Sequence, residues 1–372
     1  MTNRQRPAAT FVGVTYAGWQ TRQMNLANSV GIDGRLNATF HEVSGWKSGG
    51  LLERLPMPGG VRGRIRAIEQ TRPVAGIPRP DIIWTSATEL VLPYLWAFLG
   101  PLDRPLVVET DWTIDQQESM AREYFQRPPR TGLSLRVARW RERLFLDRVD
   151  LFSPMSNWAA DDLRRLGVPD DRIRVIHPGV DLDAWKPTSR SRTGDSPVRL
   201  LFVGGNFERK GGDLLLEAMR GTFFGRCELD IVTRDPVPET PGVTVHRAEA
   251  NSPQLRALFD RADLFVMPTR AECFGQVAVE ALASGLPVIV GKVGGTGDIV
   301  DDGVTGWRIA PDAPSLHASL EHALSVRECL PLMGARGRLV AEERFDGRRN
   351  DRLLIDLMLE LVERRRARRG AA

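Results

Sequence analysis

The chain has 372 residues, of which 42% are hydrophobic and 26% are charged, and its formal net charge is +4. The length indicates two domains, and the composition excludes a wholly disordered chain. No apolar run approaches the roughly 20 residues that span a bilayer, and the N-terminus lacks the apolar region of a signal peptide, so we expect a cytoplasmic protein. Three scattered cysteines without a CxxC pair argue against a disulfide framework or a zinc site.

Short apolar strands alternate with helical patterns through the first half of the chain. The sequence predicts strands at 10–15, 81–85, 106–110, 149–156 and 173–178, a helical run between the second and third of them, and a helix at 157–166. Residues 40–80 are rich in Gly, Pro and Arg, and we expect irregular structure there with one helix near 61–70. This alternation predicts a parallel, helix-covered sheet that binds ligands beyond the carboxyl ends of its strands.

A basic stretch, residues 136–148, has apolar residues at helical spacing. Two interpretations stay open: a helix with its apolar side on the core and a charged outer side, which is the commoner arrangement, or a peripheral contact with anionic lipid. The arginine-rich end, residues 364–369, fits a solvated helix terminus. Because no aromatic residues are interleaved with these basic runs, nucleic-acid binding is disfavoured.

The stretch 186–197 is polar, contains Pro and Gly, and lacks an apolar period, so it predicts a linker. We therefore expect an N-terminal domain over 1–186 and a second domain over 187–346. The remaining helix, 347–372, is expected to cross back to the first domain and to end in the basic tail.

The second domain opens with a strand (198–203), a glycine-rich loop that begins with Gly204 and Gly205, and a helix (213–219). This geometry lets the backbone approach a phosphate, and Arg209 and Lys210 add two positive charges. The loop is neither a Walker A loop nor a clean GxGxxG motif, which disfavours ATPase and dehydrogenase functions.

Further strands are expected at 228–233 and 243–246, followed by a helix that Ser252 caps. Next come a strand (264–268), a loop with Glu272, a helix (275–284) with Glu280 inside it, and a buried strand (287–290). The first turn of the helix at 275–284 exposes N–H groups at the positive end of its dipole, which predicts an anion site. Glu280 lies roughly 7 Å further along the axis. A ligand with its diphosphate at the helix start could offer hydroxyls to one carboxylate on each side, as in a nucleotide sugar.

These residues carry a family resemblance. The run Glu272-Cys-Phe-Gly-Gln-Val-Ala-Val-Glu280, followed by Ala-Leu-Ala-Ser-Gly-Leu-Pro-Val, resembles the signature of the glycosyltransferase family 4 type. The resemblance implies a retaining, nucleotide-sugar-dependent enzyme with the α/β GT-B fold, in which two Rossmann-like domains with parallel sheets face each other across a cleft. It also implies that Glu280 binds the ribose and that Glu272 binds the transferred sugar. Arg209, Lys210 and the amides near Phe274, Gly275 and Gln276 would hold the diphosphate.

The chain departs from the family pattern at several positions. Gly205 stands where the family has an Arg, and Asp111 stands where relatives carry a His that positions the reacting centre. We retain Asp111 as a catalytic candidate, with helix capping as the alternative, and Gly18 as a partial counterpart of the family's Gly-Gly loop. Thr233 and Arg234 are candidates for contact with the base.

The resemblance implies a nucleotide sugar and a hydroxyl acceptor as substrates, with no cofactor and no metal site, in glycan, polysaccharide or glycolipid biosynthesis. Residues 40–80 are expected to select the acceptor, and the basic helix favours a position at the inner face of the membrane. Two alternatives stay open: a nucleotide-sugar epimerase or hydrolase on the same scaffold, and a non-catalytic GT-B module.

Overall fold

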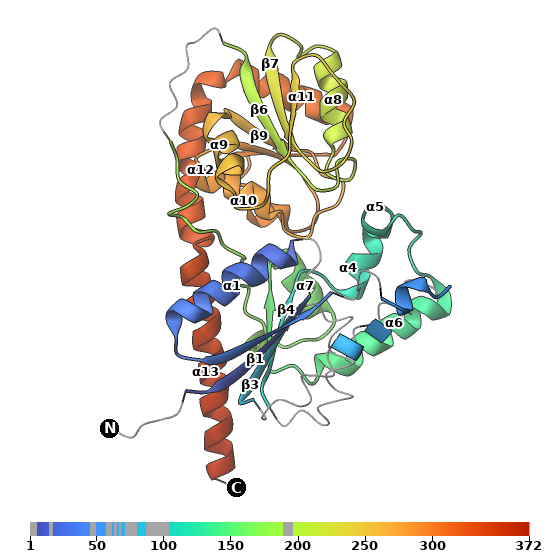
Figure 1. Cartoon of the computed structure of the whole chain (residues 1–372), viewed down its shortest axis with the longest axis vertical. Coiled ribbons are helices and arrows are strands. Elements are labelled where there is room, and N and C mark those ends of the chain that lie inside the picture. Colours follow the sequence, from blue (N-terminus) through green and yellow to red (C-terminus); the bar gives the residue numbers. More distant parts are fainter. Residues whose placement is uncertain are drawn as a thin grey trace. The chain divides into compact units, whose positions relative to one another are not determined.

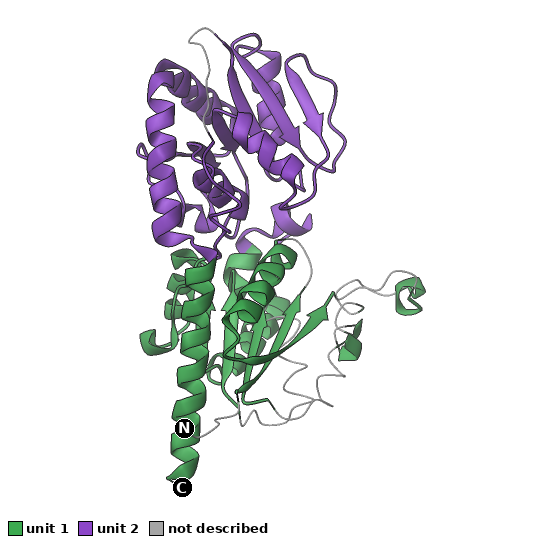
Figure 2. Ribbon diagram, turned by 60° about the vertical axis from the view of Figure 1, so that its left-hand side comes forward, with its two compact units in different colours: residues 1–118, 130–177, 348–372 green, residues 119–129, 178–347 purple. Residues whose placement is uncertain are grey.

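The computed structural model describes residues 6–14, 18–44, 50–56, 80–86, 104–188 and 196–371, together with 62, 65, 66 and 68–70 (Figure 1). The chain divides into two compact units (Figure 2). Unit 1 comprises Met1–Glu118, Arg130–His177 and Arg348–Ala372, and unit 2 comprises Ser119–Pro129 and Pro178–Gly347. The stretch 119–129 therefore packs with unit 2, although the chain on both sides of it belongs to unit 1.

Unit 1 is built on a parallel five-stranded sheet with the order β2-β1-β3-β4-β5. Its strands are β1 (Ala8–Val14), β2 (Asn37–Val43), β3 (Ile82–Ser86), β4 (Leu106–Thr110) and β5 (Leu151–Pro154). Its helices are α1 (Trp19–Asp33), the short η1 (Leu52–Arg54), α4 (Ile114–Ser119), α6 (Gly132–Leu146), α7 (Asn157–Arg165) and α13 (Gly347–Gly370). Strands β3, β4 and β5 are buried along their whole length, as is typical of strands that helices cover on both faces.

A buried charge cluster joins three elements of unit 1. The guanidinium of Arg22 on α1 lies 2.7 Å from a carboxylate oxygen of Glu109 on β4 and 2.5 Å from one of Asp351 on α13. All three side chains are almost fully buried. Buried charges are tolerated only when they are paired, so this cluster fixes α13 on the sheet of unit 1.

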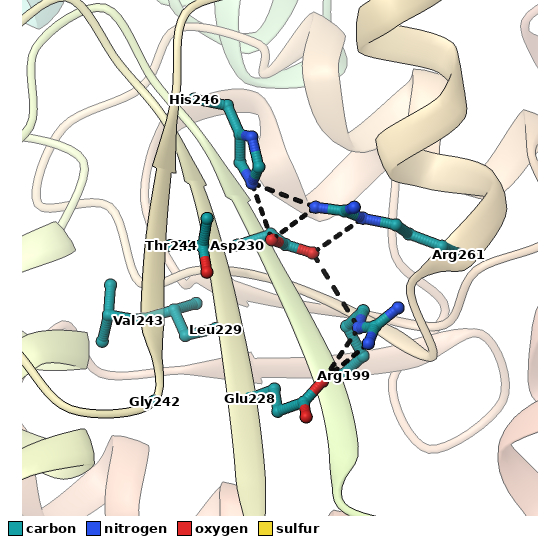
Figure 3. A pocket seen from close by; sticks show the side chains of 9 residues that line it. All are labelled: Arg199, Glu228, Leu229, Asp230, Gly242, Val243, Thr244, His246 and Arg261. Atoms are coloured by element: carbon teal, nitrogen blue, oxygen red, sulfur yellow. Dashed lines mark hydrogen bonds and ion pairs between the residues drawn. The ribbon is translucent and has the colours of Figure 1, made fainter.

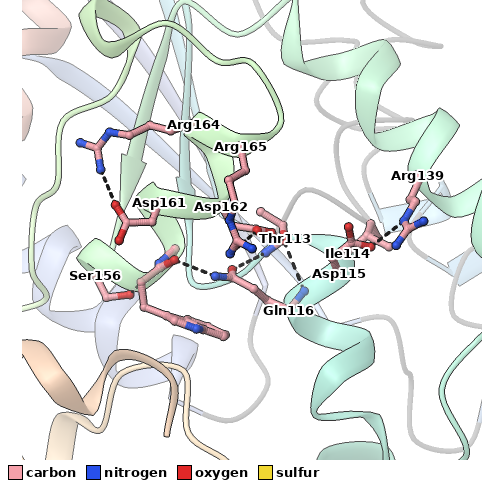
Figure 4. Close-up of polar contacts among 12 residues, drawn as sticks. Thr113, Ile114, Asp115, Gln116, Arg139, Ser156, Asp161, Asp162, Arg164 and Arg165 are labelled. Atoms are coloured by element: carbon pink, nitrogen blue, oxygen red, sulfur yellow. Dashed lines mark hydrogen bonds and ion pairs between the residues drawn. The ribbon is translucent and has the colours of Figure 1, made fainter.

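Polar contacts hold α4 between α7 and α6 (Figure 4). The hydroxyl of Thr113 donates to Asp162 on α7, and the side-chain amide of Gln116 donates to the carbonyl of Trp158 at 2.7 Å. On the other side, Arg139 on α6 pairs with Asp115 at 2.7 Å. The residues that follow β4 are thereby fixed by side-chain hydrogen bonds as well as by packing.

Unit 2 contains a parallel six-stranded sheet with the order β11-β10-β9-β6-β7-β8. Its strands are β6 (Val198–Val203), β7 (Cys227–Val232), β8 (Val243–His246), β9 (Leu264–Met267), β10 (Val288–Gly291) and β11 (Gly306–Ile309). Its helices are α5 (Ala121–Phe125), α8 (Gly212–Arg220), α9 (Pro253–Arg261), α10 (Gln276–Ala283), η4 (Gly294–Asp298), α11 (Ala313–Ser325), η5 (Arg327–Cys329) and α12 (Leu330–Arg344). Unit 1 contains one further short helix, η3 (Asp170–Arg172). This strand order is that of the doubly wound Rossmann sheet.

The predicted α/β class with two Rossmann-like halves is confirmed. The predicted cap of α9 is also confirmed, because the Ser252 hydroxyl accepts a hydrogen bond from the N–H of Leu255. The prediction of a strand at 173–178 is wrong, because this segment forms only an isolated bridge between Ile173 and Phe152. It makes two backbone hydrogen bonds to the short strand β5, and Pro178, which has no N–H group, follows.

Other predictions lie outside the described residues. These are the helical run between β3 and β4 and most of the linker at 186–197. In the helix predicted near 61–70, the described residues 62, 65, 66 and 68–70 are helical. Within the described part of the chain, no helix combines the length and the apolar content needed to span a bilayer.

Candidate donor site at the switch point of unit 2

The candidate site lies where the strand order of unit 2 reverses. Strands β6 and β9 are neighbours in the sheet, and the chain leaves them toward opposite sides of the order. In a doubly wound sheet this switch point opens a crevice at the carboxyl ends of the two strands. The loop after β6 carries Arg209 and Lys210, and the loop after β9 carries Glu272, so the predicted charged residues come from the two loops that border the crevice.

The loop after β6 needs glycine at two positions. At Gly204, a Cβ atom would lie 2.8 Å from the side chain of Lys210. At Gly211, which has a φ of +80°, it would lie 2.3 Å from the carbonyl oxygen of Pro268. Gly205, by contrast, borders open space, so the structure does not require glycine there. The loop can thus approach the β9 loop closely while Lys210 is held against its backbone.

Hydrogen bonds tie the two loops together. The N–H of Arg270 donates to the carbonyl of Arg209 at 2.8 Å, and the guanidinium of Arg270 pairs with Asp213 at 2.7 Å. The side chain of Arg209 donates to the carbonyl of Ala271. These contacts fix the backbone on both sides of the candidate charges, which is what a binding site with a defined geometry requires.

Glycines also shape the far side of the β9 loop. Gly294 has a φ of +53°, and a Cβ atom there would lie 1.8 Å from the carbonyl oxygen of Glu272. The N–H of Gly295 donates to the carbonyl of Cys273 at 3.0 Å. Gly294 and Gly295 therefore pack against the loop that carries Glu272.

Helix α10 begins after Gly275, whose φ of +103° is accessible mainly to glycine. No described residue accepts a hydrogen bond from the backbone N–H groups of Gly275, Gln276 or Val277. Such unpaired donors at the positive end of a helix favour an anionic ligand. The predicted anion site thus has its backbone donors available.

A compact ion cluster stands beside these donors. The Oε2 atom of Glu272 lies 3.1 Å from Nζ of Lys210 and 3.8 Å from Nη1 of Arg209, and all three side chains are largely buried. Burial by itself would raise the pKa of Glu272, but the charges of Lys210 and Arg209 outweigh it and lower the pKa below its ordinary value. Glu272 is therefore a buried carboxylate that stays ionised because two cations face it.

The second signature carboxylate has a different environment. Glu280 is buried in α10, and its carboxyl group forms no hydrogen bond or ion pair with any described residue. Burial raises the pKa of Glu280 to about 8, which the charge of Lys210 offsets only in part. An unpartnered buried carboxyl group of this kind can form hydrogen bonds with ligand hydroxyls.

Other predicted donor residues take different places. The ring of Phe274 is buried against Phe345, so only the backbone of this residue remains a candidate. The side-chain amide of Gln276 donates to the carbonyl of Gly179 at 3.1 Å. Thr233 is buried at the end of β7, and its hydroxyl accepts from the N–H of Asp235.

Arg234 and the two unit 1 candidates have clear local roles. Arg234 is exposed and pairs with the exposed Glu249. Gly18 precedes α1 with an ordinary helical φ of −64°, and a Cβ there would meet nothing within 4 Å, so its glycine is not sterically required. Asp111 directly follows β4 and accepts a hydrogen bond from the indole N–H of Trp19 at 3.2 Å.

Tyr124, on α5, is the residue at this site that sequence reasoning missed. Its ring stacks on the guanidinium of Arg209, with 4.1 Å between the guanidinium carbon and the ring centroid. Its hydroxyl lies 3.4 Å from Oε1 of Glu272, a residue 148 positions away in sequence. No local motif marks Tyr124, because only the packing of 119–129 with unit 2 brings it there.

A cavity of about 350 Å³, away from the candidate site, is lined by residues of strands β6, β7 and β8 (Figure 3). It contains Asp230, which pairs with Arg261 at 2.6 Å and with His246 at 2.7 Å. Because the charged groups of this cavity are paired with one another, it offers no unpaired charge to a ligand. Among the described residues, no cluster of three or more His, Cys, Asp or Glu side chains has the geometry of a metal site.

Family models match both halves of the chain. Residues 26–179 match the model described as glycosyl transferase 4-like domain, and residues 197–325 match the model described as glycosyl transferases group 1. The second match covers the candidate site.

Curated relatives carry one name. A D-inositol 3-phosphate glycosyltransferase from Pseudarthrobacter chlorophenolicus is 30% identical over 278 residues, which are 67% of this chain and 63% of that protein. One from Xylanimonas cellulosilytica is 32% identical over 243 residues, 56% of each chain. The chain thus spans less than two thirds of the length of these relatives.

Solved structures share the fold over nearly the whole chain. Sucrose-phosphate synthase from Thermosynechococcus elongatus superposes with a TM-score of 0.78 at 19% identity, covering 96% of this chain and 99% of that one. Alr3699/HepE from Anabaena in complex with UDP-glucose gives 0.69 at 16% identity, covering 95% and 100%. At these identities the likeness shows the fold alone.

The two doubly wound units and the matched structures show the GT-B fold, and the two domain matches place the chain among the glycosyltransferases. With the two domain matches and the Glu272 to Glu280 signature, the chain belongs to the glycosyltransferase family 4 type.

The environment of Glu280 leads to a pH prediction. Because its pKa is higher in the folded protein than in the unfolded chain, the stabilising proton is bound at low pH and is lost as the pH rises through about 8. Glu280→Gln keeps the neutral shape at every pH. We expect the free energy of unfolding of this variant, relative to the wild type, to rise between pH 5 and pH 8 by up to about 1.4 kcal/mol per pH unit. The difference in melting temperature between the variant and the wild type should rise with it.

The matched control is Glu217→Gln, at an exposed position on α8. Its melting temperature should follow that of the wild type at every pH. A constant difference between Glu280→Gln and wild type across this range would show that Glu280 is ionised in the folded protein.

Proposed function

We propose that the chain transfers a sugar from a nucleoside-diphosphate sugar to a hydroxyl group of an acceptor, with retention of configuration at the anomeric carbon. The observation that carries this proposal is the convergence of Lys210, Arg209 and the unpaired N–H groups of α10 at the switch point beside Glu272. This arrangement is suited to a diphosphate bonded to a polyhydroxy group. Family membership supports the same activity.

The residues divide the donor between them. We assign the diphosphate to Lys210, Arg209 and the N–H groups of Gly275 and Gln276. The unpartnered carboxyl of Glu280 accepts from the ribose hydroxyls, and Glu272 accepts from a hydroxyl of the transferred sugar. The backbone at Gly204, Gly205 and Phe274 lines the diphosphate, while Thr233 and Arg234, at the end of β7, face the base.

Charge stabilisation is the main contribution of the protein to this reaction. As the bond from the anomeric carbon to the phosphate oxygen breaks, negative charge grows on the leaving diphosphate. Fixed cations and backbone donors bind that charge more strongly in the transition state than in the ground state. We propose that the acceptor attacks on the face that the diphosphate leaves, and that a leaving phosphate oxygen takes the acceptor proton. In unit 1, Asp111 and Gly18 are the candidates for positioning the reacting groups. On this account neither a metal ion nor a cofactor is needed, since Lys210 and Arg209 supply the positive charge.

The acceptor is a hydroxyl compound that unit 1 contacts, with residues 40–80 as the candidate selector. Because the curated relatives are named D-inositol 3-phosphate glycosyltransferases, we propose D-inositol 3-phosphate as the first acceptor to assay. Roles in glycan, polysaccharide or glycolipid biosynthesis are compatible with this chemistry.

Replacing Lys210 by Met removes the charge and keeps most of the side-chain volume. We expect kcat to fall by roughly 10- to 150-fold, because a charge-assisted hydrogen bond to the leaving group contributes about 1.5–3 kcal/mol. The measurement is nucleoside-diphosphate release from UDP-, GDP-, ADP- and dTDP-glucose with D-inositol 3-phosphate present, with the anomeric configuration of the product read by NMR.

The control is Lys186→Met, at an exposed position that lies outside the candidate site. This variant should retain wild-type kcat. Release without a new glycosidic product would indicate a hydrolase, an inverted product would contradict retention, and a folded Lys210→Met variant with unchanged kcat would reject the assigned role.

Helix α6 supports a further part of the proposal, a contact with anionic membrane at the cytoplasmic face. Near the end of this helix Phe145 packs against the core of unit 1 and Leu146 is buried, but four apolar residues on its other side are exposed. Leu133 and Trp140 are 76% and 59% exposed, and Val137 and Leu144 are exposed beside them. These four residues form one stripe at spacings of three and four, and Arg136 and Arg143 flank it. An exposed apolar stripe with arginines at its edges is typical of interfacial helices.

Trp140→Glu places a negative charge in the middle of this stripe. We expect it to lower the binding to vesicles that contain phosphatidylglycerol by about tenfold, because apolar burial is lost and the new charge is repelled by the anionic lipid. The weak binding to pure phosphatidylcholine should fall by a smaller factor, because only apolar burial is lost there. Co-sedimentation measures this binding. Leu339→Glu, at an exposed apolar position on α12, is the control and should bind like wild type. Equal sedimentation of all three proteins would reject the contact.

A further inference from the structure

The segment 119–129 brings a side chain into the candidate donor site from far away in sequence. Tyr124 lies on α5, and its ring covers the guanidinium of Arg209. Its hydroxyl is 3.4 Å from Oε1 of Glu272 and 3.3 Å from the backbone nitrogen of Cys273. One phenol therefore contacts a cation, a carboxylate and a backbone N–H of the same site.

The hydrogen bonds of this hydroxyl have a clear direction. Burial, together with the negative charge of Glu272, raises the pKa of Tyr124 well above its ordinary value, so the phenol is neutral. It donates to the carboxylate of Glu272 and accepts from the N–H of Cys273. A sugar hydroxyl is also both a donor and an acceptor, so it can form the same two bonds.

These bonds are replaceable. Their lengths of 3.4 and 3.3 Å are beyond the usual range for hydroxyl hydrogen bonds, which indicates weak interactions. Glu272, in contrast, is held firmly by Lys210 at 3.1 Å. A ligand hydroxyl that reaches Glu272 therefore displaces Tyr124 more readily than it separates the ion pair.

We propose that Tyr124 is a specificity-determining residue of the donor site, whose hydroxyl occupies the position that a hydroxyl of the donor sugar takes on Glu272 and Cys273. The proposal rests on the function proposed above. Binding of the nucleotide sugar displaces the Tyr124 hydroxyl. A nucleoside diphosphate lacks the transferred sugar and leaves the Tyr124 hydroxyl in position. Tyr124 thereby lowers the affinity for any donor whose sugar lacks a hydroxyl that can replace its own on Glu272 and Cys273.

The test compares two ligands in each variant. Calorimetry gives the Kd of each nucleoside diphosphate (UDP, GDP, ADP and dTDP) and of its glucose derivative. Tyr124→Phe removes the competing hydroxyl and keeps the ring on Arg209. We expect the Kd of the sugar nucleotide to fall roughly 3- to 10-fold in this variant, which is the equivalent of one hydrogen bond. The Kd of the nucleoside diphosphate without the sugar should stay within about twofold of the wild-type value. The ratio of the two constants therefore changes.

Two further variants complete the comparison. Tyr124→Ala removes the ring as well and should shift the ratio in the same direction as Tyr124→Phe. Arg122→Ala, at an exposed position on the same short helix, should leave the ratio unchanged. Hydrogen exchange of residues 119–129 should rise when wild type binds the sugar nucleotide and should not rise with the free diphosphate.

The outcomes separate this inference from the proposed function. If the diphosphate binds but the ratio is the same in wild type and Tyr124→Phe, Tyr124 is not a competitor, and the inference alone fails. If both Tyr124 variants bind the sugar nucleotide more weakly, Tyr124 is a ligand of the sugar, which also overturns the inference. If neither wild type nor any variant binds any of the nucleotides, the proposed donor site fails, and the inference fails with it.

Discussion

The structure of the candidate donor site depends on one buried negative charge. Glu272 is shielded from water, and an ionised carboxylate is stable there only if opposite charges face it. Lys210 and Arg209 provide them, and both come from a different loop of the sheet. The two loops at the switch point must therefore meet closely, which accounts for glycine at 211, while glycine at 204 leaves room for the Lys210 side chain. The same cations that keep Glu272 ionised are those that would stabilise a diphosphate, so the charges of the candidate site are arranged before any ligand binds.

The two signature carboxylates illustrate how environment divides similar groups. Glu272 has its pKa lowered by two neighbouring cations, whereas Glu280, with no hydrogen-bonding partner, has its pKa raised by burial. One is a fixed charge and the other is a neutral acid that a ligand can engage. This difference suits a nucleotide sugar, in which the transferred sugar and the ribose lie on opposite sides of the diphosphate. The hydroxyls of the transferred sugar would bind Glu272, and those of the ribose would bind Glu280. Tyr124 adds a third element, since its hydroxyl donates to the carboxylate of Glu272.

The sequence alone predicted four of the five strands of unit 1, because apolar runs bounded by Gly and Pro are local signals, but it missed β2, most of which is not buried. It also placed Glu272, Glu280, Arg209 and Lys210 in one site through the family signature. It could not predict Tyr124 or the Arg22, Glu109 and Asp351 cluster, since those contacts join residues far apart in sequence. Helical spacing in residues 136–148 identified a helix, but it could not tell whether its apolar side was buried, and most of that side is exposed.

The most direct test of the central claim is the thermal stability of the full chain with UDP, GDP, ADP and dTDP at millimolar concentration, in wild type and in Arg209→Met. A ligand that binds only the folded state stabilises it by RT ln(1 + [L]/Kd) and so raises the melting temperature. The account predicts that at least one diphosphate raises the melting temperature of wild type and that Arg209→Met, although folded, loses most of that rise. An absence of any shift in wild type, or an equal shift in the variant, would contradict a diphosphate site built on this charge cluster.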